Sequence, residues 1–143
     1  MNNKKKSMYL TINELMLNNL ISSNDEYCTI DAFLRNGNIS TNKGTGHISE
    51  FQPIPLTEEI LLKCGFVKLK PQFSLSVGGE SLIYYLHEES KFIIWYHGEK
   101  LGYSLQQVIR NSINPECTCF NTVHELQNIF YWNKKKQELE IIL

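Results

Sequence analysis

The stretch FQPIPLTEEILLKCGF, from Phe51 to Phe66, determines how the middle of this 143-residue chain folds. Pro53 and Pro55 fix φ and hold the residues before them in extended conformations, so a stiff arm precedes the next element. Thr57 has the side chain of a helix N-cap, and the two glutamates after it favour the positive end of the helix dipole. Gly65 is the residue type that ends helices in a left-handed conformation. The stretch therefore predicts a short helix between Thr57 and Gly65.

Beyond this helix, short runs rich in aromatic and β-branched residues alternate with turn residues, which is typical of an antiparallel meander. The runs are 66–69, 72–77, 81–87 and 91–97. Both faces of LIYYLH and KFIIWYH are apolar, so the sheet is either covered twice or leaves an aromatic surface for a partner. Residues 105–113 predict a further short helix, and 138–143 predict a final strand at the sheet edge.

The sequence from Thr122 onward has the features of a capped helix. Thr122 and Glu125 have the spacing of a capping box. An apolar stripe at helical spacing follows, made of Val123, Leu126, Ile129 and Phe130. We expect this helix to cover the meander.

The N-terminal third predicts a small β subregion. Residues 27–34 alternate loosely and end at Asn36 and Gly37, a dipeptide suited to a tight hairpin turn, after which Ile39 begins the return strand. Two glycines within 42–46 predict a loop, and 9–17 fit a short helix or a strand equally.

The predicted fold class is α+β: a small antiparallel β-meander packed by a C-terminal helix, with a short capped helix and a small N-terminal β subregion. Residues 1–8 are expected to form a disordered basic tail, and 9–143 a single α+β domain.

Composition excludes a strong global electrostatic attraction to nucleic acid or membrane, because the formal net charge is −1. Lysines are nevertheless gathered in two runs, 4–6 and 134–136. No stretch has the pattern of a signal peptide or the roughly 18 to 20 apolar residues of a bilayer span. We expect a soluble intracellular protein, with reduced cysteines and no membrane contact.

Candidate catalytic and metal-binding residues lack supporting partners. His87 and His97 end neighbouring predicted strands, and their approach to each other would be needed for a small His-dependent nuclease, which is one alternative. Without a carboxylate partner or a nucleophile, such histidines are more often surface residues. Cys117, Cys119 and His124 offer three metal ligands without an evident fourth. We therefore expect no catalytic residues, no metal and no cofactor.

Two segments carry a resemblance to a known family. The run from Phe51 to Phe66 and TVHELQNIFYWNKKKQELEI near the C-terminus resemble a family of small phage and prophage proteins from Bacteroidetes. Its members carry F-x-P-I-P-L-T-E-E-x-L-L-K-x-G-F and later a V-H-Q-L-Q-N helix followed by an E-L-x-I strand. The resemblance implies a mobile-element origin and a fold.

Aromatic residues interleaved with lysines are the predicted partner-binding site, since tyrosine, tryptophan and basic side chains serve both protein interfaces and nucleic-acid stacking sites. The residues are Lys134, Lys135, Lys136, Tyr131, Trp132, Tyr85 and Trp95. The expected function is a non-enzymatic, anti-CRISPR-like inhibitor of a host defence system that binds an RNA-guided effector nuclease of type VI or its guide RNA. The alternatives are the nuclease and a phage structural or assembly adaptor that contacts only protein.

Overall fold

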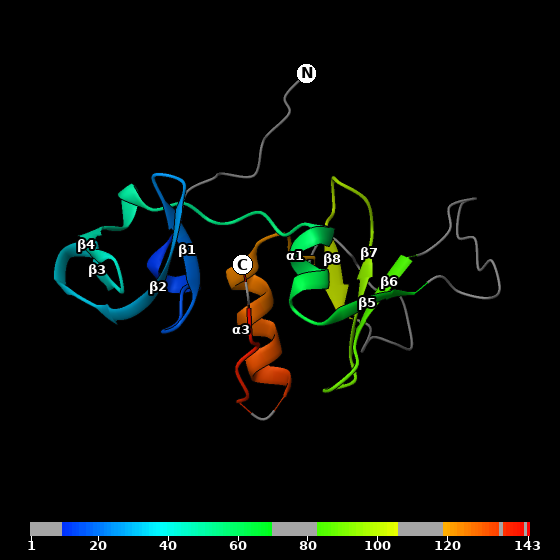
Figure 1. Cartoon of the computed structure of the whole chain (residues 1–143). Helices are drawn as coiled ribbons and strands as arrows, with labels where there is room; N and C mark the ends of the chain where they lie inside the picture. Colours follow the sequence, from blue (N-terminus) through cyan, green and yellow to red (C-terminus); the bar gives the residue numbers. More distant parts are fainter. Residues whose placement is uncertain (1–9, 70–82, 106–118, 135, 142) are drawn as a thin grey trace, which may run out of the picture. The chain divides into compact units, whose positions relative to one another are not determined.

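A computed structural model gives the fold of residues 10–69, 83–105, 119–134, 136–141 and 143. It contains two four-stranded antiparallel sheets, a short helix and a longer C-terminal helix, which confirms the α+β class (Figure 1). The chain groups into two compact units, Met1–Pro55 with Thr122–Ile129 and Leu56–Asn121 with Phe130–Leu143. A single domain over 9–143 stays a prediction, because two contact clusters in one chain need not fold independently. The predicted basic tail, 1–8, lies outside the described residues.

In the first unit, four strands follow one another in sheet order: β1 Leu20–Ser23, β2 Glu26–Phe33, β3 Asn38–Thr41 and β4 Gly44–His47. The predicted hairpin between β2 and β3 is confirmed. Its turn, the 3₁₀ helix η2 at Arg35–Gly37, holds Asn36 at φ 59° and Gly37 at φ 75°. Positive φ at both central residues is what a type I′ turn requires, which explains the Asn-Gly dipeptide.

The predicted loop at 42–46 is wrong, because Gly44 begins β4 directly after a two-residue turn. Two side chains close that turn. The Thr41 hydroxyl donates to the Gly44 carbonyl at 2.8 Å, and the Asn42 side chain accepts from the Thr29 N–H at 2.9 Å. Glycines weaken a strand but are tolerated at a sheet edge, where β4 lies.

The core of the first unit combines strand residues with the segments that flank the sheet. The cluster consists of Leu10, Leu15, Ile21, Cys28, Ile30, Ile39 and Phe51. Between Leu10 and Leu15 the chain forms a 3₁₀ helix, η1 at Ile12–Glu14, which resolves the ambiguity over 9–17. A third 3₁₀ helix, η3 at Ile48–Glu50, leads from β4 to Gln52, whose backbone pairs with Ser22 of β1.

The first turns of α3, Val123–Asn133, belong to this unit and are tied to its N-terminal segment by amide side chains. Asn128 donates to the Glu14 carbonyl at 2.9 Å and accepts from the Asn19 amide at 2.7 Å. Gln127 accepts from the Leu20 N–H at 2.8 Å.

The second unit opens with the predicted helix, α1 at Glu58–Lys63. The Thr57 hydroxyl accepts from the Ile60 N–H at 3.3 Å, and Gly65 follows the helix at φ 91°. The N-cap, the glutamates of the first turn and the glycine stop are thus confirmed.

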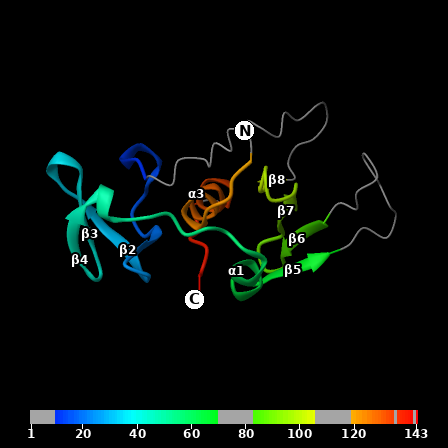
Figure 2. The same cartoon turned by 90° about the horizontal axis from the view of Figure 1, so that it is seen from above.

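The meander of the second unit consists of β5 Phe66–Leu69, β6 Ile83–His87, β7 Phe92–Tyr96 and β8 Tyr103–Leu105, paired in that order (Figure 2). Three of the predicted runs contain β5, β6 and β7, and the fourth, 72–77, lies outside the described residues. Strand β8 was not predicted: Leu105 was assigned to a helix whose remaining residues also lie outside the described ranges.

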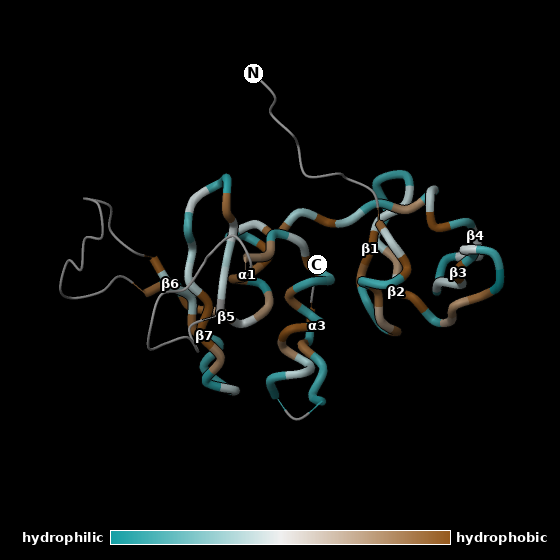
Figure 3. Tube along the Cα trace, turned by 180° about the vertical axis from the view of Figure 1, so that it is seen from behind, coloured by the Kyte–Doolittle hydropathy of each residue, from teal (hydrophilic) through white to brown (hydrophobic). Residues whose placement is uncertain are grey.

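The C-terminal helix is capped as predicted, since the Thr122 hydroxyl bonds to the Glu125 carboxylate at 2.7 Å. Figure 3 shows apolar and polar residues alternating along α3. The aromatic cover over the meander comes from Phe130, whose ring lies 5.2 Å from that of Phe92. The predicted strand at 138–143 is wrong for the described residues, because 137–141 pair with no strand.

Candidate functional site

The predicted aromatic pair lies at the last turn of α3. The rings of Tyr131 and Trp132 meet edge to face at 5.4 Å, and Trp132 is 65% exposed. Edge-to-face contact is a favoured aromatic geometry, so each ring restrains the other. An indole this exposed, on a helix fixed by its cap, is available to a partner.

Two of the three predicted lysines lie within the described residues, and they differ in their surroundings. The Lys134 ammonium is 5.9 Å from the centre of the Phe92 ring, and its side chain is partly buried. Lys136 is exposed and has a left-handed backbone, with φ 64°. Lys135 lies outside the described residues. Lys134 therefore packs within its own unit, whereas Lys136 is exposed to solvent.

The two predicted sheet residues lie on opposite faces. Trp95 pairs with Tyr84, and their half-buried rings are 5.6 Å apart. Tyr85, the next residue after Tyr84, is 3% exposed and belongs to the other face. Its hydroxyl donates to the Glu58 carboxylate at 2.8 Å, and burial together with this bond raises its pKa. The structure thus places Tyr85 in the core and Trp95 on the less buried face.

Glu58 is the centre of a small polar network under the meander. Besides the Tyr85 hydroxyl it contacts the Lys68 ammonium at 2.8 Å. The Lys68 hydrogen bond, and then that of Tyr85, hold the pKa of the Glu58 carboxyl below its ordinary value. This network anchors the first turn of α1 to β5 and β6, which is a structural role.

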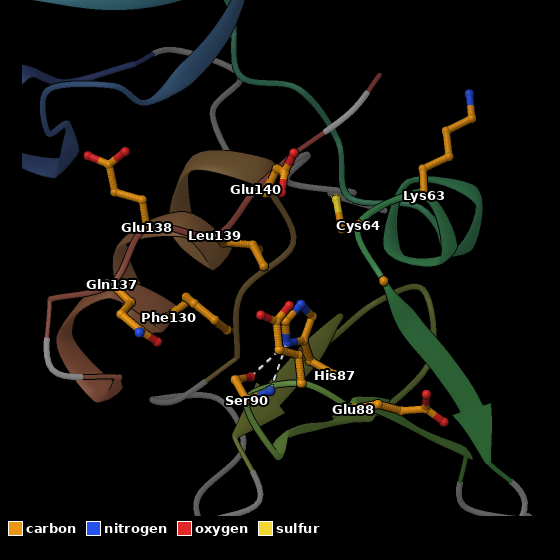
Figure 4. A pocket seen from close by; sticks show the side chains of 12 residues that line it. Lys63, Cys64, His87, Glu88, Ser90, Phe130, Gln137, Glu138, Leu139 and Glu140 are labelled. Atoms are coloured by element: carbon orange, nitrogen blue, oxygen red, sulfur yellow. Dashed lines mark hydrogen bonds between the residues drawn. The ribbon is translucent and has the colours of Figure 1, made fainter.

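A pocket of about 750 Å³ lies in the second unit, on the side of the meander that Phe130 covers (Figure 4). Its walls are the end of α1 with the turn after it at 63–65, the end of β6 with the β6–β7 turn at 87–90, Phe130, and the segment 137–140. Its volume is within the roughly 300 to 1,000 Å³ range of small-molecule and cofactor sites. Sequence reasoning missed this pocket, because its walls come from four separate segments.

His87 is the titratable group at the centre of this pocket. The Ser90 N–H points at Nδ1 at 3.4 Å and the Ser90 hydroxyl lies 2.7 Å from it, so Nδ1 is an acceptor. The ring proton is then on Nε2. The imidazole also makes a hydrogen bond to the backbone of Cys64. Burial lowers the pKa of His87, although the Glu89 carboxylate opposes that shift. The imidazole therefore joins the turn after α1 to the β6–β7 turn.

A neutral histidine that touches a serine hydroxyl is a possible general base. In the β6–β7 turn, however, two backbone N–H groups already hydrogen-bond to His87. The Ser90 N–H is directed at the imidazole, and the Lys91 N–H donates to the His87 carbonyl at 2.8 Å. Neither group remains to stabilise an oxyanion, which acyl transfer needs.

His87 and His97 do not approach each other as the nuclease alternative requires. His87 pairs with Phe92 at one end of the β6–β7 hairpin, whereas Tyr96, the neighbour of His97, pairs with Ile83 at the other. At about 3.3 Å per residue, four residues separate these ends by roughly 13 Å. The C-terminal ends of successive antiparallel strands lie at opposite ends of a hairpin, so two residues that each end such a strand are far apart. His97 instead lies 2.6 Å from the Ser104 hydroxyl, and burial lowers its pKa.

Two of the three candidate metal ligands belong to different units. Cys119 is half-buried in the second unit, and His124 is buried in the first, 3.8 Å from the Glu14 carboxylate. Cys117 lies outside the described residues. Within the described ranges, no group of three or more histidine, cysteine or acidic side chains is placed to hold a metal ion.

Comparisons with protein-family models, with curated proteins and with solved structures found no match to this chain. In the described part of the chain, no helix combines the length and the apolar character that a membrane span needs.

Proposed function

We propose that this chain is a non-catalytic binding protein of phage or prophage origin that inhibits a bacterial defence system in the host cytoplasm. Its partner is an RNA-guided effector nuclease of type VI, loaded with its guide RNA. The observation that carries the proposal is Trp132, 65% exposed beside Tyr131 at the end of α3. The resemblance of two segments to mobile-element proteins supports the choice of partner.

The energetics of an exposed indole support a binding role. Large exposed aromatic side chains are costly to hydrate and are enriched among the residues that dominate interfaces. Because the Trp132 ring already contacts the Tyr131 ring, less side-chain entropy is lost when a partner immobilises it. Lys136, exposed in the same segment, adds a positive charge for phosphate or carboxylate.

The test is inhibition of target-RNA cleavage by a purified type VI effector. Trp132→Ala should weaken inhibition by at least about tenfold, the scale of an interface hot spot. Tyr27→Ala is the matched control, because Tyr27 is 47% exposed in the first unit and should leave inhibition unchanged. Equal inhibition by wild type and both variants, or none by wild type, would contradict the proposal. Binding assays with and without guide RNA separate a protein contact from an RNA contact.

A second experiment addresses the nuclease alternative. The double change His87→Ala and His97→Ala should leave inhibition within several-fold of wild type, whereas loss of a true general base costs about 10² to 10⁴ in rate. Circular dichroism of the double variant checks that the fold is retained. A loss on the larger scale in a folded variant would favour a histidine-dependent enzyme.

A further inference from the structure

We propose that the turn at Asn36 and Gly37 is a modification site, at which Asn36 loses its side-chain amide without an enzyme, and that the folded hairpin delays this reaction. The inference goes beyond the proposed function. It concerns the first unit and needs no partner.

The reaction closes a ring and then opens it. The Gly37 backbone nitrogen attacks the side-chain carbon Cγ of Asn36 and forms a new C–N bond, the nitrogen loses its proton, and the side-chain amide leaves as ammonia. Water then adds to one of the two carbonyl carbons of the resulting succinimide. Attack at Cγ gives aspartate, and attack at the backbone carbon gives isoaspartate, in which the main chain runs through the former side chain.

The hairpin itself requires the two residues that react. Gly37 has φ 75°, and a Cβ at this position would lie 2.8 Å from the His47 Nε2, so a larger residue does not fit. Asn36 has φ 59°, a conformation that asparagine tolerates better than most L-residues. Because glycine has no Cβ, its backbone nitrogen is also the one least shielded from the preceding side chain. Asn36 is exposed, so water reaches the ring once it has formed.

The backbone of the closed turn holds the two reacting atoms apart. Ring closure requires the Gly37 nitrogen and the Asn36 Cβ to be eclipsed about the Cα–C bond, whereas at ψ 35° they lie nearly opposite each other. Two backbone bonds keep this geometry: the Asn38 N–H donates to the Arg35 carbonyl, and the Leu34 N–H donates to the Asn38 carbonyl at 2.8 Å. Since each bond contributes about 1 kcal/mol net, the closed turn should slow the reaction at least about tenfold.

The isoaspartate product should damage the hairpin that formed it. An extra main-chain atom at position 36 disturbs the turn that sets the pairing of Phe33 with Ile39. Ile39 is fully buried in the core of the first unit. Modified molecules should therefore unfold at lower urea concentration than unmodified ones.

A second turn of the same unit supplies a matched internal control. Asn24 and Asp25, between β1 and β2, are exposed and have φ 49° and 64°, so this turn has the same left-handed backbone. The residue after Asn24, however, has a side chain that shields its nitrogen. Asn24 should therefore react much more slowly than Asn36.

The test follows both asparagines by peptide mass spectrometry while the full-length protein is kept at mildly alkaline pH. Isoaspartate is measured with an isoaspartate methyltransferase, and a synthetic peptide of residues 33–40, FLRNGNIS, gives the rate without the fold. We expect Asn36 to react at least about tenfold more slowly in the protein than in the peptide, and urea to remove that difference. The urea midpoint should fall with incubation in wild type but not in Asn36→Gly, which keeps a residue suited to the turn and has no amide to lose.

Four results would each overturn the proposal. They are equal rates for Asn36 in the folded protein and in the peptide, conversion of Asn24 as fast as that of Asn36, no conversion of Asn36 in the folded protein over several months, and an equal fall of the midpoint in Asn36→Gly. None of them depends on the effector or on Trp132.

Discussion

Gly65 ends α1 because the chain must reverse there at φ 91°, a conformation that L-residues rarely adopt. The position is also close to His87, since a Cβ at Gly65 would lie 3.4 Å from the imidazole Nε2. One glycine thus serves both the helix stop and the approach of the histidine that joins two turns.

Replacement of Gly65 by valine should therefore lower the free energy of unfolding by more than about 1 kcal/mol, because a β-branched residue is strained at positive φ. Cys64→Ala is the control and should cost less, since it only trims a small buried side chain. The urea midpoint of unfolding of each variant, compared with that of wild type, measures its loss of stability. An unchanged midpoint for Gly65→Val would mean that the backbone at this residue is not left-handed in solution.

His87 should make stability depend on pH in a defined direction. Burial lowers its pKa below the ordinary value of 6.5, so the unfolded chain takes up the proton first as pH falls. The stability contributed by the neutral imidazole is complete above about pH 6.5 and is lost below it. Between about pH 7.5 and 5.5, the urea midpoint of wild type should fall more than that of His87→Gln, which cannot titrate. Parallel decreases in the two proteins would assign the effect to other groups.

At the scale of elements, hydrogen-bonded caps explain why both helices begin where they do. Thr57 and Thr122 each accept a backbone N–H three residues later, and Thr122 also bonds to Glu125. Neither α1 nor α3 needs tertiary contacts to define its first residue, which is why the sequence located both starts.

Removing one cap measures how much that cap contributes to the free energy of unfolding. Thr122→Ala should destabilise the protein by about 1 kcal/mol, because the first turn of α3 loses a partner for an N–H group. Thr45→Ala, an exposed change on β4, should stay within about 0.5 kcal/mol of wild type. A Thr122→Ala midpoint equal to that of Thr45→Ala would show that the cap contributes nothing in solution.

Unlike the starts of α1 and α3, the strands are not located by local sequence alone. Residues 138–143 have the alternation of a strand, yet their described part forms no strand, while Gly44–His47 is a paired strand despite two glycines. A strand needs a partner whose edge is free and within reach, and alternation alone does not supply one. The turn bonds of Thr41 and Asn42 bring β4 to β3 directly, and no such turn serves 138–143.

For the whole molecule, the distribution of charge decides what kind of partner the lysine run meets. If the surface near Trp132 contacts RNA, changing Lys134, Lys135 and Lys136 to glutamine should weaken binding and flatten its salt dependence, because each lost phosphate contact releases one counterion fewer. Since Lys134 lies over Phe92, part of its effect should appear as a small loss of stability.

The matched control changes three exposed lysines elsewhere, Lys43, Lys91 and Lys100, to glutamine. The measurement is log affinity against log salt for wild type and both triple variants. Lines that run parallel for wild type and the 134–136 variant would mean that these lysines do not touch phosphate, and would favour a protein contact through Trp132.

Sequence by itself determined the local parts of this protein. The caps at Thr57 and Thr122, the stop at Gly65 and the turn at Asn36 and Gly37 are set by interactions within a few residues, so local side-chain chemistry suffices to place them. The exposure of Trp132 follows from the same logic, because this residue lies on the polar side of the apolar stripe of α3, and its role in partner binding stays a prediction.

Only the tertiary structure decided which faces and segments meet. Both faces of β6 are apolar, so the sequence did not indicate that Tyr85 turns to the core and bonds Glu58. The separation of His87 from His97 follows from strand register, and the pocket arises from four segments distant along the chain. These features depend on which surfaces exclude water together, a property of the assembled core that no short stretch of sequence contains.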